Sequence, residues 1–210
     1  MSVQDLGRMG YRQAWELQER AHEVVVNGGA ETIFIVEHEP VITLGRREES
    51  IRNLVTSRDE LERQGIELVH SDRGGDITYH GPGQIVAYPI IRLAAHGYSV
   101  GGYVHKLESI IIAALAEIGI TGEVDPSAVG VWVKDRDAAA KIGAIGVRVR
   151  RGVSLHGLAL NVSEDLSNFR HIVPCGLAGR PVTSVQKILG SSAPTFVEVK
   201  QILTRRLGSL

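Results

Sequence analysis

The stretch KIGAIGVRVRRGVSLHGLALN (residues 141–161) decides the class of fold. Small and β-branched residues dominate residues 141–150 and 153–161, which is typical of strands. Within the first segment, Val147 and Val149 alternate with arginines, so the valines should face one side of a sheet and the arginines the other. The stretch therefore predicts two neighbouring strands of a sheet with one apolar and one polar face.

Apolar periodicity and turn residues predict the remaining elements outward from this pair. Helices are expected at residues 5–27, 103–118 and 195–207, with a short one between Ser57 and Gly65, and strands at residues 32–36, 41–44, 67–71, 76–79, 84–90 and 130–134. Strands in runs with inserted helices favour an α+β fold with a mixed or antiparallel sheet. Neither GxGxxG nor GxxxxGK occurs, so no motif supports a dinucleotide fold or a P-loop.

Bulk composition is that of an ordinary globular domain. The 210 residues are 43% hydrophobic and 22% charged, with a formal net charge of −1. We expect one domain over residues 1–210, with no charge-driven attraction to nucleic acid or to a membrane. The N-terminus has no apolar core of signal-peptide type, and no apolar run approaches the roughly 20 residues that cross a bilayer. A single cysteine excludes an internal disulfide and favours a cytoplasmic setting.

Four stretches carry residue types that chemistry uses. In Arg73–Gln84, four glycines and a proline bracket a short polar strand, where backbone can approach a ligand closely. The alternative is two tight turns around an edge hairpin. Lys141–Gly146 opens with a lysine that is either held in an apolar site or exposed at the start of a strand. His156–Asn161 opens with a histidine that is either structural or beside a narrow slot formed by glycine and alanine.

The fourth stretch, Ile172–Gly176, contains the cysteine between proline and glycine. A free thiol is mostly protonated at neutral pH, so a nucleophilic Cys175 needs a nearby cation. Four candidates for that cation remain open at this point, and they are Lys141, His80, His156 and His171. The alternative is a small buried hydrophobe. His38, between two glutamates, is expected in a solvated turn, and no metal site is predicted.

Taken together, these stretches resemble the octanoyltransferase family of lipoate biosynthesis. The resemblance runs in order from about Tyr11 to Val185. Its motifs are Glu37–Arg46, Arg73–Gln84, Lys141–Gly146, His156–Asn161, Pro174–Gly176 and Val182–Ser184. It implies the fold of biotin protein ligases and lipoate-protein ligases, a mixed and largely antiparallel sheet flanked by helices, with an acyl tunnel.

The resemblance also implies residue roles without a cofactor or a metal. Cys175 would accept the acyl group, and Lys141 would lower the thiol pKa and act as acid and base. The substrate-binding residues would be Arg73, Gly74, Gly75, Asp76, Ile77, Thr78, Tyr79, His80, Ala144, Ile145, Gly146, Gly157, Leu158 and Ala159. The small side chains among them would leave room for an aliphatic chain.

The implied partners are an octanoyl-acyl carrier protein as donor and lipoyl domains as acceptors, namely those of 2-oxoacid dehydrogenase E2 subunits and the glycine cleavage H protein. The enzyme is expected to act as a monomer. Arg148, Arg150 and Arg151, with Arg46-Arg47, form either a basic docking patch for acidic partners or a solvated strand face. Two other functions remain open: an ATP-dependent lipoate-protein ligase, and a non-catalytic module that binds acyl groups or lipoyl domains.

Overall fold

A computed structural model describes residues 1–135, 138–173 and 180–210. Its strands are β1 (Ser2–Met9), β2 (Thr32–His38), β3 (Val41–Leu44), β4 (Glu67–His70), β5 (Thr78–His80), β6 (Gln84–Ile90), β7 (Gly122–Asp125), β8 (Ala128–Asp135), β9 (Ala138–Arg150) and β10 (Val153–Asn161). Its α-helices are α1 (Tyr11–Val26), α2 (Arg58–Arg63), α3 (Val100–Glu117), α4 (Val185–Leu189) and α5 (Phe196–Leu207), and short 3-10 helices include η1 (Glu48–Asn53), η2 (Leu93–His96), η3 (Leu166–His171) and η5 (Gly190–Ser192).

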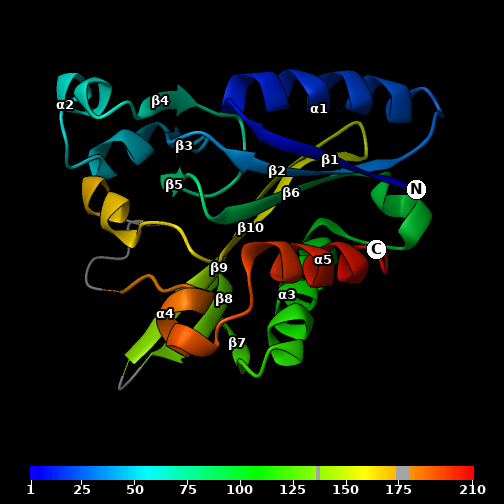
Figure 1. The fold of residues 1–210 in the computed structure, drawn as a ribbon. Helices are drawn as coiled ribbons and strands as arrows, with labels where there is room; N and C mark the ends of the chain where they lie inside the picture. Colours follow the sequence, from blue (N-terminus) through cyan, green and yellow to red (C-terminus); the bar gives the residue numbers. More distant parts are fainter. Residues whose placement is uncertain (136–137, 174–179) are drawn as a thin grey trace.

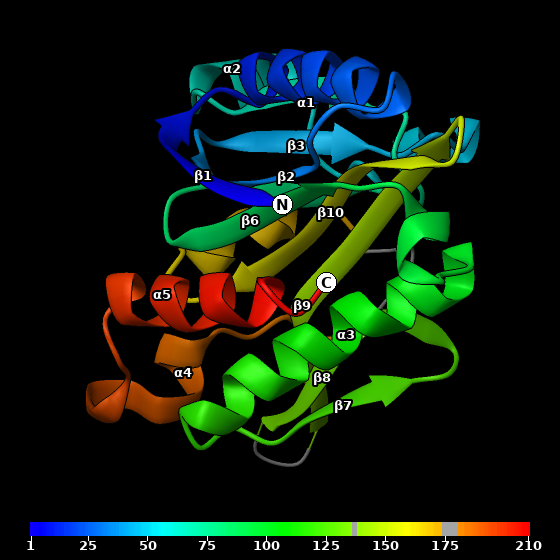
Figure 2. The same ribbon diagram turned by 90° about the vertical axis from the view of Figure 1, so that its right-hand side faces the viewer.

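Seven strands form the main sheet in the order β1-β2-β6-β10-β9-β8-β7, and β4-β3-β5 form a second, smaller sheet. All neighbours in the main sheet are antiparallel except β1 and β2. Helix α1 covers one face of the main sheet, and α3 and α5 cover the other (Figures 1 and 2). The predicted α+β fold with a mixed, largely antiparallel sheet flanked by helices is confirmed.

The central strands are buried on both faces, because each face carries a helical layer. In β6, Ile85 and Ala87 join the core under α3 and α5, whereas Val86 and Tyr88 join the core under α1. The same alternation holds in β2 and β10. Such strands read as continuous apolar runs rather than as polar–apolar alternation.

The predicted helix over residues 5–27 is wrong at its start. Residues 2–9 form β1, which pairs in parallel with β2, and the helix begins at Tyr11 after Gly10. Leu6 and Met9 both pack against the core under α1, and because they are three residues apart, their pattern looks like that of a helix. As an edge strand with mostly exposed residues, β1 carries no alternation that would reveal it.

Other boundaries agree with the sequence signals. Ser57 accepts a hydrogen bond from the Glu60 amide at the start of α2, and Thr195 and Glu198 form a full capping box at the start of α5. None of the described helices is long and apolar enough to cross a membrane.

Candidate active site

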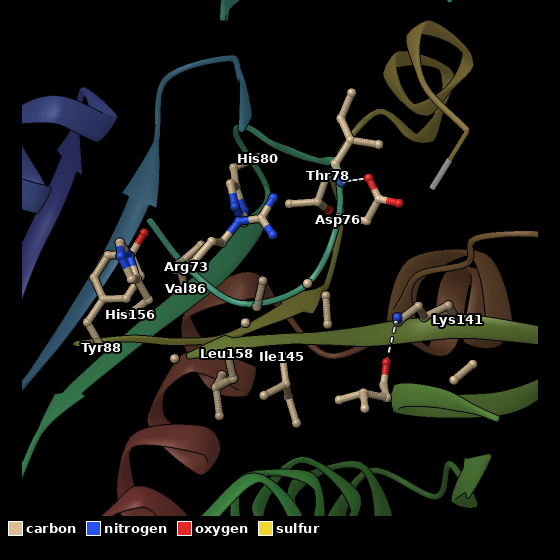
Figure 3. A pocket seen from close by; sticks show the side chains of 18 of the residues that line it. Arg73, Asp76, Thr78, His80, Val86, Tyr88, Lys141, Ile145, His156 and Leu158 are labelled. Carbon is tan, nitrogen blue, oxygen red and sulfur yellow. Dashed lines mark hydrogen bonds between the residues drawn. The ribbon is translucent and has the colours of Figure 1, made fainter. Parts of the chain in front are cut away.

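A pocket of about 250 Å³ lies between the β9–β10 pair and the loop that leads into β5 (Figure 3). Its lining residues are Tyr11, Arg47, Arg73, Gly75, Asp76, Ile77, Thr78, His80, Val86, Tyr88, Ser127, Ala128, Val129, Lys141, Ala144, Ile145, Gly146, His156, Gly157, Leu158 and Ala159. Lys141 lies at one end of the pocket, and Tyr88 and His156 lie at the other. Aliphatic side chains and glycines line the space between, so the pocket is an apolar slot with two polar ends.

The fold brings most of the predicted substrate-binding residues to this one pocket. Two of them are not among its lining residues. The Gly74 amide donates to the Val147 carbonyl and so ties the loop to β9, and the Tyr79 ring packs against Phe169. Cys175 lies outside the described residues, so its placement stays a prediction.

Two pocket glycines are required by backbone packing. A Cβ on Gly157 would lie 2.2 Å from the Ala87 carbonyl oxygen, and one on Gly146 would lie 2.9 Å from the Gly74 carbonyl oxygen. Glycine therefore lets the neighbouring strand β6 and the loop approach β10 and β9. The sequence interpretation, in which these residues are small to leave room for a chain, accounts for only part of their role.

Arg73 holds the loop over the slot. Its side chain is buried, and it donates to the Thr43 hydroxyl, to the Thr43 carbonyl and to the Gly74 carbonyl. Asp76, farther along the loop, accepts from the Ile77 amide and from the Asn53 side chain. These bonds link the loop to β3 and η1, so the slot has a fixed roof.

Neutral imidazoles surround the end of the slot that lies away from Lys141. His38 donates from Nδ1 to the Met9 carbonyl and accepts from the Tyr88 hydroxyl at Nε2. Burial lowers the pKa of His38 to about 4 and that of His80 to about 3. The expectation that His38 lies in a solvated turn is wrong, because β2 continues to His38 and buries it completely. Among the described residues, no cluster of three or more potential ligands could hold a metal.

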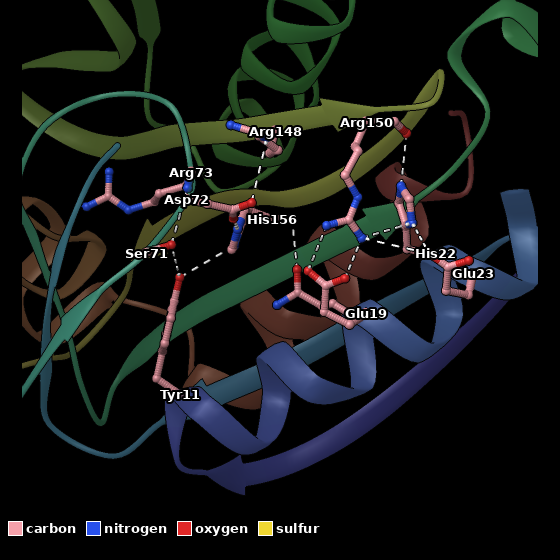
Figure 4. A network of polar contacts seen from close by, with 11 residues as sticks. Tyr11, Glu19, His22, Glu23, Ser71, Asp72, Arg73, Arg148, Arg150 and His156 are labelled. Atoms are coloured by element: carbon pink, nitrogen blue, oxygen red, sulfur yellow. Dashed lines mark hydrogen bonds and ion pairs between the residues drawn. The ribbon is translucent and has the colours of Figure 1, made fainter. Parts of the chain in front are cut away.

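His156 joins this end of the slot to the surface (Figure 4). Its Nε2 donates to Asp72 at 2.7 Å, and its Nδ1 lies 3.4 Å from the Tyr11 hydroxyl. Asp72 also lies 3.7 Å from the Arg148 guanidinium. Burial lowers the pKa of His156, while the Asp72 carboxylate acts in the opposite direction. His156 has a positive φ of 57°, and the Gln18 side chain accepts a hydrogen bond from its amide.

The arginines at the end of β9 and in the turn after it are ion-paired within the chain. Arg150 pairs with Glu19 and Arg151 with Glu23, both on α1, and Arg148 pairs with Asp72. The predicted separation of arginines and valines holds, because Val147 and Val149 pack against the core under α3. These ion pairs weaken the interpretation of Arg148, Arg150 and Arg151 as a docking patch, because their charge is balanced locally.

Lys141 is 8% exposed, which excludes the alternative of a lysine on the open surface. Its Nζ donates to the Val129 carbonyl at 2.7 Å and lies 5.4 Å from the centre of the Trp132 ring. Its backbone bonds to the other neighbouring segment, since the amide donates to Pro181 and the carbonyl accepts from Thr183. The β8 strand therefore holds the ammonium group at one end of the slot, while residues 181–183 hold the backbone of Lys141 on the other side.

The described chain approaches the slot on both sides of residues 174–179. Before them, the Val173 amide donates to the Asn53 carbonyl, and the Asn53 side chain donates to Asp76 in the slot. After them, Pro181 bonds to the backbone of Lys141. The described residues on either side of 174–179 thus bond to residues that line the slot or contact its lining.

Sequence reasoning missed part of the lining. Tyr11 begins a helix, Tyr88 lies in a buried strand, and Ser127–Val129 span the end of the β7–β8 turn and the start of β8. None of these stretches has a motif. Only the packing of β6 against β10, and of the β7–β8 hairpin against β9, brings them to the slot.

The buried histidines predict a pH-dependent stability. The pKa of His38 is about 4 in the fold against 6.5 when it is unperturbed, so between these values the unfolded chain binds a proton that the folded chain does not. Its contribution is complete above pH 6.5 and decreases as the pH falls towards 4, by about 1.4 kcal/mol per pH unit. We expect His38→Gln to remove that slope from the unfolding free energy measured by urea denaturation at pH 7, 6 and 5.

The comparison must be made as a difference between wild type and variant. Burial raises the pKa of Glu164 to about 8, so this group is protonated in the fold and its stabilisation decreases as the pH rises from 4.5 to 8. That opposing slope is common to both proteins and cancels in the difference. His70→Gln, at an exposed position on β4, is the control and should follow wild type. Parallel curves for His38→Gln and wild type would contradict the prediction.

Comparisons with known proteins agree with this geometry. The chain matches the family model of the lipoyl protein ligase A/B catalytic domain over residues 10–208. An octanoyltransferase from Chloroflexus aggregans is 47% identical over 209 residues, which cover 99% of this chain and 93% of that protein. A lipoate-protein ligase A structure with bound ATP has a TM-score of 0.79 at 16% identity, over 99% of this chain and 84% of that one.

The Aquifex aeolicus biotin protein ligase in complex with biotin and ATP has a TM-score of 0.59 at 14% identity, over 99% of this chain and 69% of that one. At such low identity these two structures bear on the fold alone, and they confirm the predicted likeness to lipoate and biotin ligases. The sequence matches go further, because they cover nearly the whole of both chains. The chain belongs to the octanoyltransferase family, and its activity is octanoyl transfer in protein lipoylation.

Proposed function

We propose that the octanoyl group passes through a thioester on Cys175, with Lys141 as acid and base. The observation that carries the proposal is the buried Lys141 ammonium at one end of an apolar slot. The attachment of the segments before and after residues 174–179 to Asn53 and to Lys141 supports placing the thiol at the same end. Val129, which accepts from Lys141 Nζ, lines that end of the slot.

Each half-reaction balances with these two groups. In the first, the Cys175 thiolate attacks the donor thioester, the bond to the donor sulfur breaks, and the Lys141 ammonium protonates the departing thiolate. In the second, the amine of the acceptor lysine attacks the enzyme thioester, and the neutral Lys141 takes up the proton that the amine loses. The products are the amide, the Cys175 thiolate and the Lys141 ammonium, which are ready for another cycle.

Electrostatics favours this assignment. A thiolate and an ammonium about 4 Å apart at a partly buried site attract each other by about 4 kcal/mol before desolvation. Because about 1.4 kcal/mol equals one pKa unit, such an attraction can ionise a thiol near neutral pH. The acyl chain adds affinity in the slot, at about 0.8 kcal/mol for each buried CH₂ group.

The proposed donor is an octanoyl-acyl carrier protein. The proposed acceptors are lysines of lipoyl domains, those of 2-oxoacid dehydrogenase E2 subunits and the glycine cleavage H protein. The chain would act as one domain and as a monomer in the cytoplasm. Arg46 and Arg47 support docking of an acidic donor, because both are exposed, Arg47 lines the slot, and neither forms an ion pair within the described residues.

Intact-mass spectrometry tests the donor and the route together. We expect wild-type enzyme to gain one octanoyl group from octanoyl-acyl carrier protein without ATP, and to lose it when a lipoyl domain is added. Free octanoate with ATP should give neither adduct nor transfer. Transfer from free octanoate that depends on ATP would instead identify a lipoate-protein ligase, and no transfer from either donor would indicate a binding module.

Arg47→Glu tests the docking surface. Reversing one charge beside the slot should raise the KM for the octanoyl carrier protein about fivefold or more at low salt, with kcat little changed, because electrostatic contacts mainly affect encounter. The matched control is Arg151→Glu, whose wild-type guanidinium is paired with Glu23. Equal KM values for Arg47→Glu and wild type, at both low and high salt, would exclude Arg47 from docking.

Ala144→Leu tests the slot as the acyl site. Ala144 is a half-buried lining residue that packs against the core under α1, so a larger side chain there must occupy part of the 250 Å³. We expect kcat/KM for octanoyl transfer to fall about tenfold or more, and by less for a butanoyl donor, since a misfit of one or a few methylenes costs that much. Ala95→Leu, at an exposed position on η2, should match wild type. An equal loss of kcat/KM for the octanoyl and butanoyl donors would show that the acyl chain binds outside this slot.

A further inference from the structure

One amide group connects the Lys141 ammonium to a buried carboxylate. The amide joins Val129 and Gly130, near the start of β8. Its carbonyl oxygen, on Val129, accepts from Lys141 Nζ at 2.7 Å. Its N–H, on Gly130, donates to Glu108 Oε1 at 3.0 Å. The carboxylate and the ammonium therefore bond to opposite ends of the same peptide group.

This arrangement strengthens the acceptor that Lys141 uses. Electrons of an amide are delocalised from nitrogen to oxygen, so a carboxylate that draws on the N–H increases the negative charge on the carbonyl. The Glu108 side chain is only 5% exposed, where such polarisation is weakly screened. Its other oxygen lies 2.9 Å from the exposed His105 ring. Through Glu108, helix α3 thus holds the Val129–Gly130 peptide, and this peptide in turn holds the Lys141 ammonium.

Gly130 is required at this position for two reasons. Its φ is +124°, a conformation that other residues rarely adopt. A Cβ there would lie 2.6 Å from Lys141 Cε and 3.1 Å from Nζ, so the lysine packs where a side chain would be. The amide, the bare Cα of Gly130 and the Trp132 ring form a socket for the end of the Lys141 side chain.

We propose that Glu108 is a positioning residue for acyl transfer, acting on Lys141 through the Val129–Gly130 peptide. The proposal rests on the role proposed above for Lys141. Glu108 lines no part of the slot, so it acts without touching the acyl group. It fixes Lys141 Nζ at its end of the slot, where both proposed half-reactions use this nitrogen.

Three substitutions separate positioning from bulk stability. Glu108→Ala removes the acceptor, and we expect kcat to fall about tenfold or more with an unchanged KM, because small misplacements of a catalytic group cost up to about 100-fold. Glu108→Gln keeps an oxygen that can accept from Gly130, and kcat should stay within about fivefold of wild type, since a neutral acceptor preserves most of the bond. The control Glu123→Gln, an exposed carboxylate on β7, should be unchanged.

A double-mutant cycle then asks whether Glu108 acts through Lys141. In the Lys141→Ala background, Glu108→Ala should cause no further loss of the residual rate. The same loss as in wild type would overturn the proposal, as would a wild-type kcat for Glu108→Ala when Lys141→Ala is inactive. A wild-type rate for Lys141→Ala would instead overturn the proposed role of Lys141. The two failures are therefore distinguishable.

An NMR measurement tests the connection even if Glu108→Ala fails to fold. A carboxylate acceptor moves an amide proton downfield, so the Gly130 signal should move upfield in Glu108→Gln. It should also move upfield in Lys141→Ala, because losing the donor to the Val129 carbonyl weakens the polarisation of the same amide. Glu123→Gln should leave the signal in place. A Gly130 signal that does not respond to Lys141→Ala would show that the amide does not connect the two side chains.

Discussion

Cys175→Ala is expected to abolish the octanoyl adduct and to reduce octanoyl transfer by about 10⁴-fold or more. Without the thiol there is no acyl-enzyme, and only direct attack of the acceptor lysine on the donor remains. Removing the nucleophile from an enzyme that uses covalent catalysis usually leaves the small acceleration due to binding alone. The measurements are intact mass after incubation with octanoyl-acyl carrier protein and the rate of lipoyl-domain modification.

Binding is the internal control for this prediction. Cys175→Ala should bind the octanoyl carrier protein within about twofold of the wild-type Kd, because the slot and the arginines beside it are retained. Cys175→Ser should also transfer poorly, since a hydroxyl is far less ionised than a thiol at neutral pH. A wild-type transfer rate in Cys175→Ala would show that the acceptor amine attacks the donor directly, and would end the thioester mechanism.

The sequence predicts most of the sheet because its strands carry local signals. Residues 141–150 and 153–161 lie in β9 and β10 as expected, since alternation and small residues are properties of the strands themselves. The start of α1 could not be placed in this way. An exposed edge strand satisfies only one side of its backbone and needs no apolar face, so β1 looked like an extension of the helix.

The candidate site is predictable only in part, for a similar reason. Glycines and polar side chains mark the loop before β5 and the start of β10, and these residues do line the slot. In the sequence, Tyr11 and Tyr88 cannot be told from core residues, and both are in fact buried. They line the slot only because of the way α1 and β6 pack. The burial of His38 depends likewise on Met9 and Tyr88, which are distant in the chain.

The burial of Lys141 could not be predicted from its neighbours in the sequence. Taken alone, a lysine at the start of a strand is more often exposed than buried. Its burial here arises from β8 on one side and from Pro181 and Thr183 on the other. Neither neighbour is close in sequence, so a motif can identify the residue while only the fold explains its environment.

Lys141→Ala is the second large expected effect. It should slow acylation of Cys175 by about 10²–10⁴-fold, the range that general acid–base groups contribute, and more where the ammonium also stabilises the thiolate. The fold should be retained, because the strand bonds of Lys141 are made by its backbone. Stopped-flow acylation under single-turnover conditions measures the first half-reaction, and lipoyl-domain modification by isolated acyl-enzyme measures the second.

Both half-reactions should slow, because the same nitrogen donates a proton in one and accepts a proton in the other. Lys134→Ala is the matched control, since Lys134 is an exposed lysine on the adjacent strand β8. A near-normal rate of acylation in Lys141→Ala would show that a histidine, and not Lys141, acts as the acid and base. His80 and His156 line the slot, but burial holds the pKa of each below its usual value, and His156 lies at the end away from Lys141. An imidazole kept neutral cannot stabilise a thiolate as a cation, and for this reason the ammonium of Lys141 is the group on which acylation should depend.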